Sequence, residues 1–259
     1  ARFEGEEEIS RPYWFRIELV SDDPEIALRD ALDTEALLTV RHGDEIREVA
    51  GIVGEFEQCQ ELPDNRFLYR ALLVPRLSLL GQSRQCQIYG TAEPVTIPDI
   101  IESELKEDSK KALEGIDRQP RRPIDYDMRL GREYPERDYV VQYNESDLDF
   151  ISRLMEHRGI FYFFEVTDGR DTVVIGDESF AFGTAGGAPI PYRPPSGLAA
   201  PAAHAIHRFT CRSRMLPGKV TLRDYNYRLP HVSLLAEMGV DEAGHGIVAN
   251  HGDHFRTPE

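Results

Sequence analysis

The amino-acid sequence predicts an α+β protein in which β-structure dominates, on two observations. Over residues 1–95, short segments that alternate apolar and polar side chains are separated by turn-forming residues, a spacing typical of antiparallel barrels or sandwiches. Over residues 96–182, two segments carry helix-capping residues, and a hairpin pattern follows the second. A chain of 259 residues is long enough for one large domain or two smaller ones.

The N-terminal strands are bounded by turn chemistry. The segment that alternates from Phe15 ends in a Ser-Asp-Asp-Pro turn at residues 21–24, and Pro75 ends the last strand. The His-Gly-Asp sequence at 42–44 predicts a hairpin turn, and the Pro-Asp-Asn sequence at 63–65 predicts another turn. We expect strands at residues 14–20, 36–41, 46–49, 51–57 and 67–74.

A first helix is predicted to begin at Thr96. Thr96 can cap the helix, Pro98 fits the first turn because its missing N–H costs nothing there, and Asp99 interacts favourably with the helix dipole. The apolar stripe of this helix consists of Ile97, Ile101 and Leu105.

A second helix is predicted from Ser146 to Gly159, because a capping box of the S-x-x-D type opens it and glycine suits the left-handed position after its last turn. Its apolar face consists of Leu148, Ile151, Leu154 and Met155. Residues 160–166 and 172–175 then flank Asp168-Gly169, which predicts a hairpin with a type I′ or bulged turn.

The C-terminal part begins after a segment rich in proline and glycine. Residues 183–203 include two Pro-containing motifs, Pro-Ile-Pro and Pro-Pro, and mark a linker or a long ordered loop. Strand-like sequence resumes at residues 204–211 and 218–225. The chain has no initiator Met, and we expect it to be a fragment of a longer polypeptide.

Charge excludes one class of function. The chain has 46 acidic and 30 basic residues, a net charge of −16, and such a chain is repelled by phosphate backbones and anionic lipids. The acid is uneven: residues 1–35 carry a net −7, whereas residues 201–259 carry +1 and hold six of the eight histidines. We expect no general nucleic-acid binding, and read the acidic N-terminal part as a solvated face or a surface for a partner.

The three cysteines and the lack of long apolar runs limit the class further. Cys59, Cys86 and Cys211 have no C-x-x-C spacing, which favours reduced, packed and inert thiols over disulfides or a zinc ribbon. We expect no transmembrane helix, because no run approaches the ~20 apolar residues that span a bilayer. We expect no signal peptide, because the first residues have neither a basic segment nor an apolar segment after it.

Catalytic motifs such as G-x-S-x-G, H-E-x-x-H and a phosphate-binding loop are absent from the sequence. Three imidazoles and one carboxylate near the end of the chain could hold zinc, and they belong to His245, His251, His254 and Asp253. The surrounding glycine-rich sequence favours an exposed loop instead. We therefore expect no metal and no cofactor.

Other charged groups have structural explanations. Asp22 with Asp23, and Asp147 with Asp149, are expected to stabilise a turn and a helix N-terminus rather than to form a hydrolase site. The arginines at 121, 122, 129, 132 and 137 alternate with acids, so they form no nucleic-acid stripe.

Residues 132–165 closely resemble the signature stretch of the VgrG family, the trimeric spike proteins of bacterial type VI secretion systems, which are related to contractile phage tail hubs. Further matches follow in the family's order at residues 15–24, 51–58, 69–75, 97–101, 191–197 and 218–226. We expect the chain to lack the family's first strand and the parts of the family that follow residue 259.

The resemblance implies two barrel-like antiparallel β domains bridged by α/β elements. The expected parts are a first barrel at 1–95 without its first strand, an α/β insertion at 96–182, a linker at 183–203 and a truncated second barrel at 204–259. The motif residues, with structural roles, are Pro98, Asp99, Tyr143, Ser146, Asp147, Asp149, Phe150, Gly159, Tyr162, Arg223, Asp224 and Tyr225.

The implied function is mechanical. The full-length protein would be a homotrimer whose base ring docks on the hexameric Hcp tube, with baseplate proteins, a needle-tip protein and effectors as further partners. It would lie in the bacterial cytoplasm and be delivered on firing. The alternatives are a contractile phage tail baseplate hub and, less favoured, a cell-wall hydrolase or metal-dependent enzyme.

Overall fold

The computed structural model describes residues 2–43, 45–63, 65–106, 123–183, 192, 206, 208–225, 229–240 and 244–251. The chain divides into two compact units, residues 1–185 and residues 186–259, which are described separately. None of the helices in these ranges is long and apolar enough to cross a membrane.

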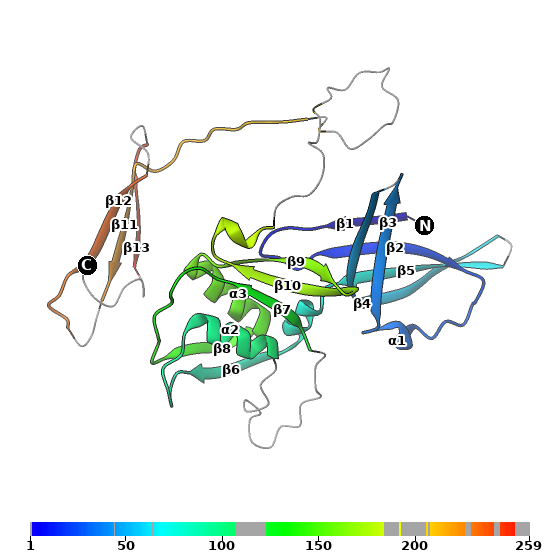
Figure 1. Cartoon of the computed structure of the whole chain (residues 1–259), viewed down its shortest axis with the longest axis horizontal. Coiled ribbons are helices and arrows are strands. Elements are labelled where there is room, and N and C mark those ends of the chain that lie inside the picture. Colours follow the sequence, from blue (N-terminus) through cyan, green and yellow to red (C-terminus); the bar gives the residue numbers. More distant parts are fainter. Residues whose placement is uncertain are drawn as a thin grey trace. The chain divides into compact units, whose positions relative to one another are not determined.

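A five-stranded antiparallel sheet forms the N-terminal part of the first unit (Figure 1). Its strands are β1 (Arg2–Glu6), β2 (Trp14–Ser21), β3 (Glu35–His42), β4 (Glu45–Leu62) and β5 (Arg66–Val74), in the order β1-β2-β5-β4-β3. Period-two alternation explains its two faces, because Phe67, Tyr69, Ala71 and Leu73 are buried while the residues between them are half-buried. A short helix, α1 (Leu28–Ala31), lies between β2 and β3.

Strand β4 corrects one prediction. Residues 46–49 and 51–57 were expected to be separate strands, but they belong to one strand that runs from Glu45 to Leu62. Its first half pairs with β3 and its second half with β5, with bulges between Val53 and Glu55 and between Gln58 and Gln60. A bulge bends a strand without ending it, so one strand serves two partners.

The α/β part of the first unit follows β5. The 3₁₀ helix η1 (Arg76–Gln82) leads to β6 (Arg84–Tyr89), which pairs with β8 (Val140–Ser146). A three-stranded sheet, in the order β7-β10-β9, contains β7 (Asp125–Arg129), β10 (Arg170–Gly176) and β9 (Phe161–Thr167). The pair β7–β10 is parallel and the pair β9–β10 antiparallel. A second 3₁₀ helix, η3 (Ser179–Ala181), follows.

The two predicted helices are confirmed as α2 (Ile97–Lys106) and α3 (Asp147–Arg158). They lie beside the three-stranded sheet in Figure 1. Their apolar stripes pack into one cluster together with residues of η1, β9 and β10, and of the predicted stripe residues Leu148 is only partly buried. This cluster, called the helix cluster below, contains Leu77, Leu80, Tyr89, Ile97, Ile100, Ile101, Leu105, Ile124, Phe150, Ile151, Leu154, Met155, Ile160, Tyr162, Val173 and Ile175.

Both predicted hairpins are also confirmed. Strands β3 and β4 meet around Gly43, which has a φ of +61°. Strands β9 and β10 are joined by Asp168 and Gly169, with φ values of 51° and 75°. Positive φ at both central residues of a two-residue loop defines a type I′ turn.

The second unit contains a three-stranded sheet in the order β12-β11-β13. Its strands are β11 (Lys219–Asp224), β12 (Leu234–Gly239) and β13 (Ile247–His251), and β13 pairs with β11 in parallel. The sheet is therefore mixed, not antiparallel throughout as expected. Within residues 218–225, Lys219–Asp224 form a strand, but residues 208–211 do not, and Ile206 makes only an isolated bridge to Tyr192. Phe209 is 81% exposed, so that segment lacks a sheet to pack against.

The prediction of packed thiols is wrong. Cys59, Cys86 and Cys211 are free, as expected, but all three are exposed. Cys86 lies on β6, where alternation turns its side chain outward and the adjacent Gln85 inward. The β-dominated α+β fold class itself is confirmed.

Candidate functional site

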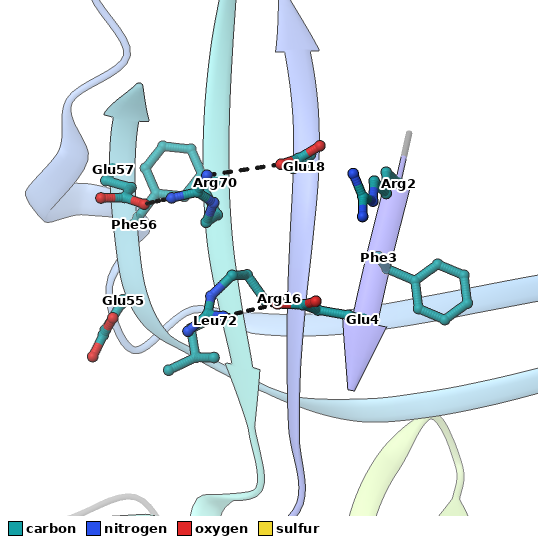
Figure 2. Close-up of a pocket in the computed structure, with 10 residues that line it drawn as sticks. All are labelled: Arg2, Phe3, Glu4, Arg16, Glu18, Glu55, Phe56, Glu57, Arg70 and Leu72. Atoms are coloured by element: carbon teal, nitrogen blue, oxygen red, sulfur yellow. Dashed lines mark hydrogen bonds and ion pairs between the residues drawn. The ribbon is translucent and has the colours of Figure 1, made fainter. Parts of the chain in front are cut away.

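The outward face of the five-stranded sheet carries rows of charged side chains (Figure 2). Strand register places Arg2 opposite Glu18, Glu18 opposite Arg70, and Arg70 opposite Glu57. One row therefore crosses four strands with alternating charge. A second row contains Glu4, Arg16, Leu72 and Glu55. This pattern follows from the period-two alternation, since each strand contributes every second residue to the same face.

Ion pairs connect neighbouring side chains within these rows. The Arg16 guanidinium donates to Glu4 at 2.8 Å, and Arg70 donates to Glu57 at 2.5 Å and lies 3.7 Å from Glu18. The hydrogen bond to Glu57 raises the pKa of Arg70 above its ordinary value. All of these side chains are at least one-third exposed, and exposed pairs contribute little stability.

The rows line a groove of about 610 Å³, bounded also by Phe3 and Phe56. Its ten lining residues include three arginines and four glutamates, and three of the glutamates pair with arginines. A nearly balanced charge gives no strong field for anions or cations. The groove thus presents charges of both signs, a pattern that complements a surface with opposite charges at matching positions.

The motif residues at the start of α3 form a helix cap. The Ser146 hydroxyl accepts a hydrogen bond from the Asp149 N–H at 3.0 Å and donates one to the Asp149 carboxylate at 2.7 Å. Between them, Asp147 is buried and accepts hydrogen bonds from the side-chain amides of Gln142 and Gln85. These carboxylates therefore have structural partners.

Other motif residues lie in the helix cluster or end a helix. Phe150 is fully buried and stacks on Tyr89, with ring centroids 5.2 Å apart. Tyr162 is 1% exposed, and burial raises its pKa to about 12. Gly159 ends α3 with a left-handed φ of 66°, a conformation in which glycine has no Cβ penalty.

At α2, Pro98 occupies the first turn, and the Asp99 carboxylate accepts hydrogen bonds from the Thr96 N–H at 3.0 Å and the Thr96 hydroxyl at 2.6 Å. The remaining motif residue of the first unit, Tyr143 on β8, is 78% exposed.

The nine motif residues of the first unit do not lie in one site. Arg223, Asp224 and Tyr225 belong to the second unit, where the Asp224 carboxylate accepts the Tyr225 N–H at 2.6 Å and Tyr225 is 70% exposed. Those of the first unit lie at the N-termini of α2 and α3, at the C-terminus of α3, in the helix cluster and on the exposed face of β8.

The histidine cluster lies largely outside the described residues. Asp253, His254 and the side chain of His251 are not described, and His245 is. Within the described ranges, no group of three or more His, Cys, Asp or Glu residues could hold a metal ion. Of the other expected carboxylate pair, Asp23 accepts the Glu25 N–H at 2.9 Å in the predicted turn.

Two of the interleaved arginines, Arg129 and Arg132, pair with acids. Arg129 bonds Asp127 at 2.8 Å and both oxygens of Glu165, at 3.0 and 2.7 Å, and these hydrogen bonds raise its pKa. Arg132 lies 3.7 Å from Glu178. Arg121 and Arg122 are outside the described residues.

Sequence reasoning missed a buried charge cluster around Arg76. The Arg76 guanidinium donates to Asp171 at 2.7 Å and to Asp125 at 2.8 Å. Arg76 and Asp171 are each 2% exposed. The only sequence signal is an arginine directly after Pro75 at the end of an apolar strand, and it does not identify partners 95 and 49 positions away.

The sequence also matches known proteins. The family model described as phage tail baseplate hub (GPD) matches residues 6–259. Two relatives from Pseudomonas aeruginosa, named type VI secretion system spike proteins VgrG4b and VgrG1b, are 35% and 30% identical over 239 residues, 90% of this chain. The chain spans only 27% and 29% of their lengths.

One solved structure is similar to this chain in both sequence and fold. The Escherichia coli c3393 protein, titled a component of the type VI secretion system with structural similarity to T4 bacteriophage tail proteins gp27 and gp5, is 30% identical with a TM-score of 0.58. The match covers 69% of this chain and 45% of that one. Because the hub-family model matches almost the whole length of the chain, this chain belongs to the phage tail baseplate hub (GPD) family.

Proposed function

We propose that this chain is part of the base of a type VI secretion spike. The observation that carries the proposal is the hub-family match over residues 6–259, together with relatives that are named spike proteins and are 30–35% identical over 90% of the chain. The role is structural: the base carries a membrane-puncturing needle and transmits the force of contraction to it.

The proposed assembly is a homotrimer of the full-length protein, docked on an Hcp-like tube hexamer and on baseplate proteins. A closed threefold ring needs heterologous contacts, in which one surface of a subunit meets a different surface of the next. The groove on the five-stranded sheet supports this assembly, because its charge rows fit a neighbour that carries charges of opposite sign at matching positions. Needle-tip proteins and effectors would bind elsewhere on the full-length protein.

The domain limits and the motif residues are part of the same proposal. We assign residues 1–95 to a first barrel, 96–182 to an α/β insertion, 183–203 to a linker and 204–259 to the start of a second barrel. The motif residues are proposed to be structural, which is supported by the cap at Ser146 and the burial of Phe150.

We further propose that the chain has no catalytic activity and is delivered from the bacterial cytoplasm by the secretion machinery itself. Relatives named as spike proteins support this. A metal assay on purified protein tests the enzymatic alternative. Stoichiometric zinc that is lost in His251→Ala and in His254→Ala would contradict a purely mechanical role.

The alternative is a contractile phage tail hub, which the description of the matching family favours. The sequence downstream of residue 259 separates the two. A long repetitive needle in the same polypeptide indicates a secretion spike, whereas a separately encoded spike indicates a phage hub.

Cryo-electron microscopy of the full-length protein tests the structural proposal. We expect a threefold ring in which each subunit contributes the two units described above. A full-length protein that forms no threefold ring would overturn the proposal for both the secretion and the phage variants.

A further inference from the structure

The chain leaves the first unit along one face of the three-stranded sheet. Strand β10 ends at Gly176, and η3 follows it. Side chains alternate along β9: Tyr162 is buried in the helix cluster, so Phe161 and Phe163 lie on the opposite face of the sheet. The residues after β10 turn back over that opposite face, because the ring of Phe182 contacts both of these phenylalanines.

Phe182 stacks on two rings of β9. Its ring lies 4.8 Å from that of Phe161, with an angle of 4° between the planes, and 5.0 Å from that of Phe163, with an angle of 25°. Stacked aromatic rings attract one another beyond the effect of the apolar area that they bury. Phe182 is 41% exposed, so this stack lies at the surface of the first unit and outside the helix cluster.

Ala181, just before the stacked ring, is fully buried at the end of β10. A Cβ at Gly176 would collide with the Ala181 side chain, so glycine on β10 permits this close approach. The Ala181 carbonyl accepts a hydrogen bond from Arg129 on β7 at 2.8 Å, and the same guanidinium donates to Glu165 on β9 at 2.7 Å. The turn after β10 is therefore in contact with all three strands of the sheet.

The backbone of the turn adds only short-range hydrogen bonds. The Ala181 N–H donates to the Glu178 carbonyl at 3.0 Å, and the Phe182 N–H donates to the Ser179 carbonyl at 3.3 Å. Bonds of this 3₁₀ type have poorer geometry than those of an α-helix. Phe180, between the two residues that contact the sheet, is 56% exposed. The turn thus depends on the contacts of Ala181 and Phe182 to stay on the sheet.

We propose that residues 178–182 form an anchor that fixes where the chain leaves the first unit, and that this anchor opens independently of the three-stranded sheet. Local elements that bury little apolar surface open more easily than the strands on which they pack. A pull on the connection to the second unit then acts on the anchor before it acts on β10. The anchor is a property of the fold and does not depend on the hub function proposed above.

Native-state hydrogen exchange of the 259-residue chain, followed at single amides by NMR, tests the anchor. In the unaltered chain, the amides of Ala181 and Phe182 should exchange more slowly than those of an unstructured chain, but faster than those of Val173 and Ile175 on β10. In Phe182→Ala, the amides of residues 181 and 182 should exchange about tenfold faster or more, because both ring stacks are lost. The β10 amides should not change.

Three further variants separate the contacts. Phe182→Tyr keeps the stacked ring and should keep the protection of residues 181 and 182. Phe180→Ala is the matched control, because it removes a nearby ring that is more exposed and lies over the backbone of Gly131, and its effect should be much smaller. Arg129→Met removes the hydrogen bond to the Ala181 carbonyl and should speed exchange of the same two amides.

Each part of the proposal has a result that would overturn it. Unprotected amides at Ala181 and Phe182 in the unaltered chain would show that no anchor forms. Unchanged exchange in Phe182→Ala, or an equal rise in Phe180→Ala, would show that the ring stack does not hold the turn. A rise in Phe182→Ala that spreads equally to the β10 amides would show that the turn opens only together with the sheet.

Discussion

Asp177 shows how one buried carboxylate organises a loop. The side chain is 3% exposed and accepts hydrogen bonds from the N–H groups of Gly131 at 2.9 Å and Arg132 at 3.0 Å. The Tyr134 hydroxyl donates a further hydrogen bond at 2.9 Å. Burial pushes the pKa of Asp177 upward, but these hydrogen bonds favour the charged form more strongly and leave the pKa below its usual value.

The first prediction concerns the pH dependence of stability. Because the folded-state pKa of Asp177 is depressed, ionised Asp177 stabilises the fold at pH values above its unfolded pKa of about 4. This contribution is lost as the pH falls through the lower folded pKa. Asp177→Asn should therefore lower the melting temperature at neutral pH, with a difference from the unaltered chain that shrinks below about pH 4. A difference that stays constant over the acid range in thermal unfolding would contradict this assignment.

Gly159 carries the second prediction. Its φ of 66° is left-handed, and a Cβ there would meet nothing closer than the Arg132 side chain at 3.7 Å. The cost of alanine at this position is thus conformational and not steric. Gly159→Ala should reduce the free energy of unfolding by about 1–2 kcal/mol, as measured by urea denaturation. Gly183→Ala, where φ is not positive and no neighbour lies within 4 Å, should change it little. Equal effects of the two substitutions would show that backbone conformation at Gly159 is not the cause.

Among the elements, α2 and α3 have N-termini closed by their own side chains. Thr96 and Asp99 close the first, and Ser146 and Asp149 close the second. Each hydroxyl accepts a hydrogen bond from the backbone N–H of the aspartate three residues later, a donor that has no partner within the helix. Each aspartate carboxylate in turn accepts a hydrogen bond from that hydroxyl. Helix α3 also connects β8 to β9, so its first residue fixes where β8 ends and its last turn fixes where β9 begins.

The third prediction tests the α3 cap. Ser146→Ala removes the acceptor for the Asp149 N–H and should cost about 1 kcal/mol of stability, measured by urea unfolding. Ser146→Asn is the matched control, because asparagine is as good an N-cap residue as serine. If Asn and Ala destabilise the protein equally, the hydroxyl contributes through packing and not through the cap.

At the scale of the whole molecule, the two units differ in how they bury apolar surface. The first unit contains the helix cluster and a smaller apolar cluster of Tyr13, Phe15, Val49 and Leu73. In the second, register places Val220, Met238 and Val248 side by side on one face of the sheet. Met238 is 74% exposed and Val248 is 40% exposed. A sheet face of this kind is stable only when another surface covers it.

The fourth prediction is that the 259-residue chain binds an apolar fluorescent dye such as ANS through this face in the native state. Met238→Lys should reduce the dye fluorescence. Leu235→Lys, on the opposite face and 53% exposed, should reduce it much less. Equal loss in both variants would place the dye site elsewhere.

Much of the fold follows from local sequence patterns. The caps at Thr96 and Ser146, the left-handed Gly159 and the Asp168-Gly169 turn involve residues within a few positions of one another, so their chemistry can be read without a fold. Local patterns did not reveal β1, β6, β7, β8, β12 or β13. Strand β7 shows why, since its five residues are only partly buried or exposed and it forms by parallel pairing with β10.

By itself, the sequence determined the β-dominated class, both helices with their caps, both hairpins and, through colinear resemblance, the family. Only the tertiary structure decided what depends on distant partners. It made one bent strand of the two expected at β4, because β3 and β5 pair with different halves of it. It exposed Cys59 and Cys86, because the side of a strand that faces a core depends on the elements that cover it. It also brought Arg76 to Asp171 across 95 positions. A local sequence pattern does not identify the opposite charge that a buried arginine contacts, because only the folded chain brings such distant residues together.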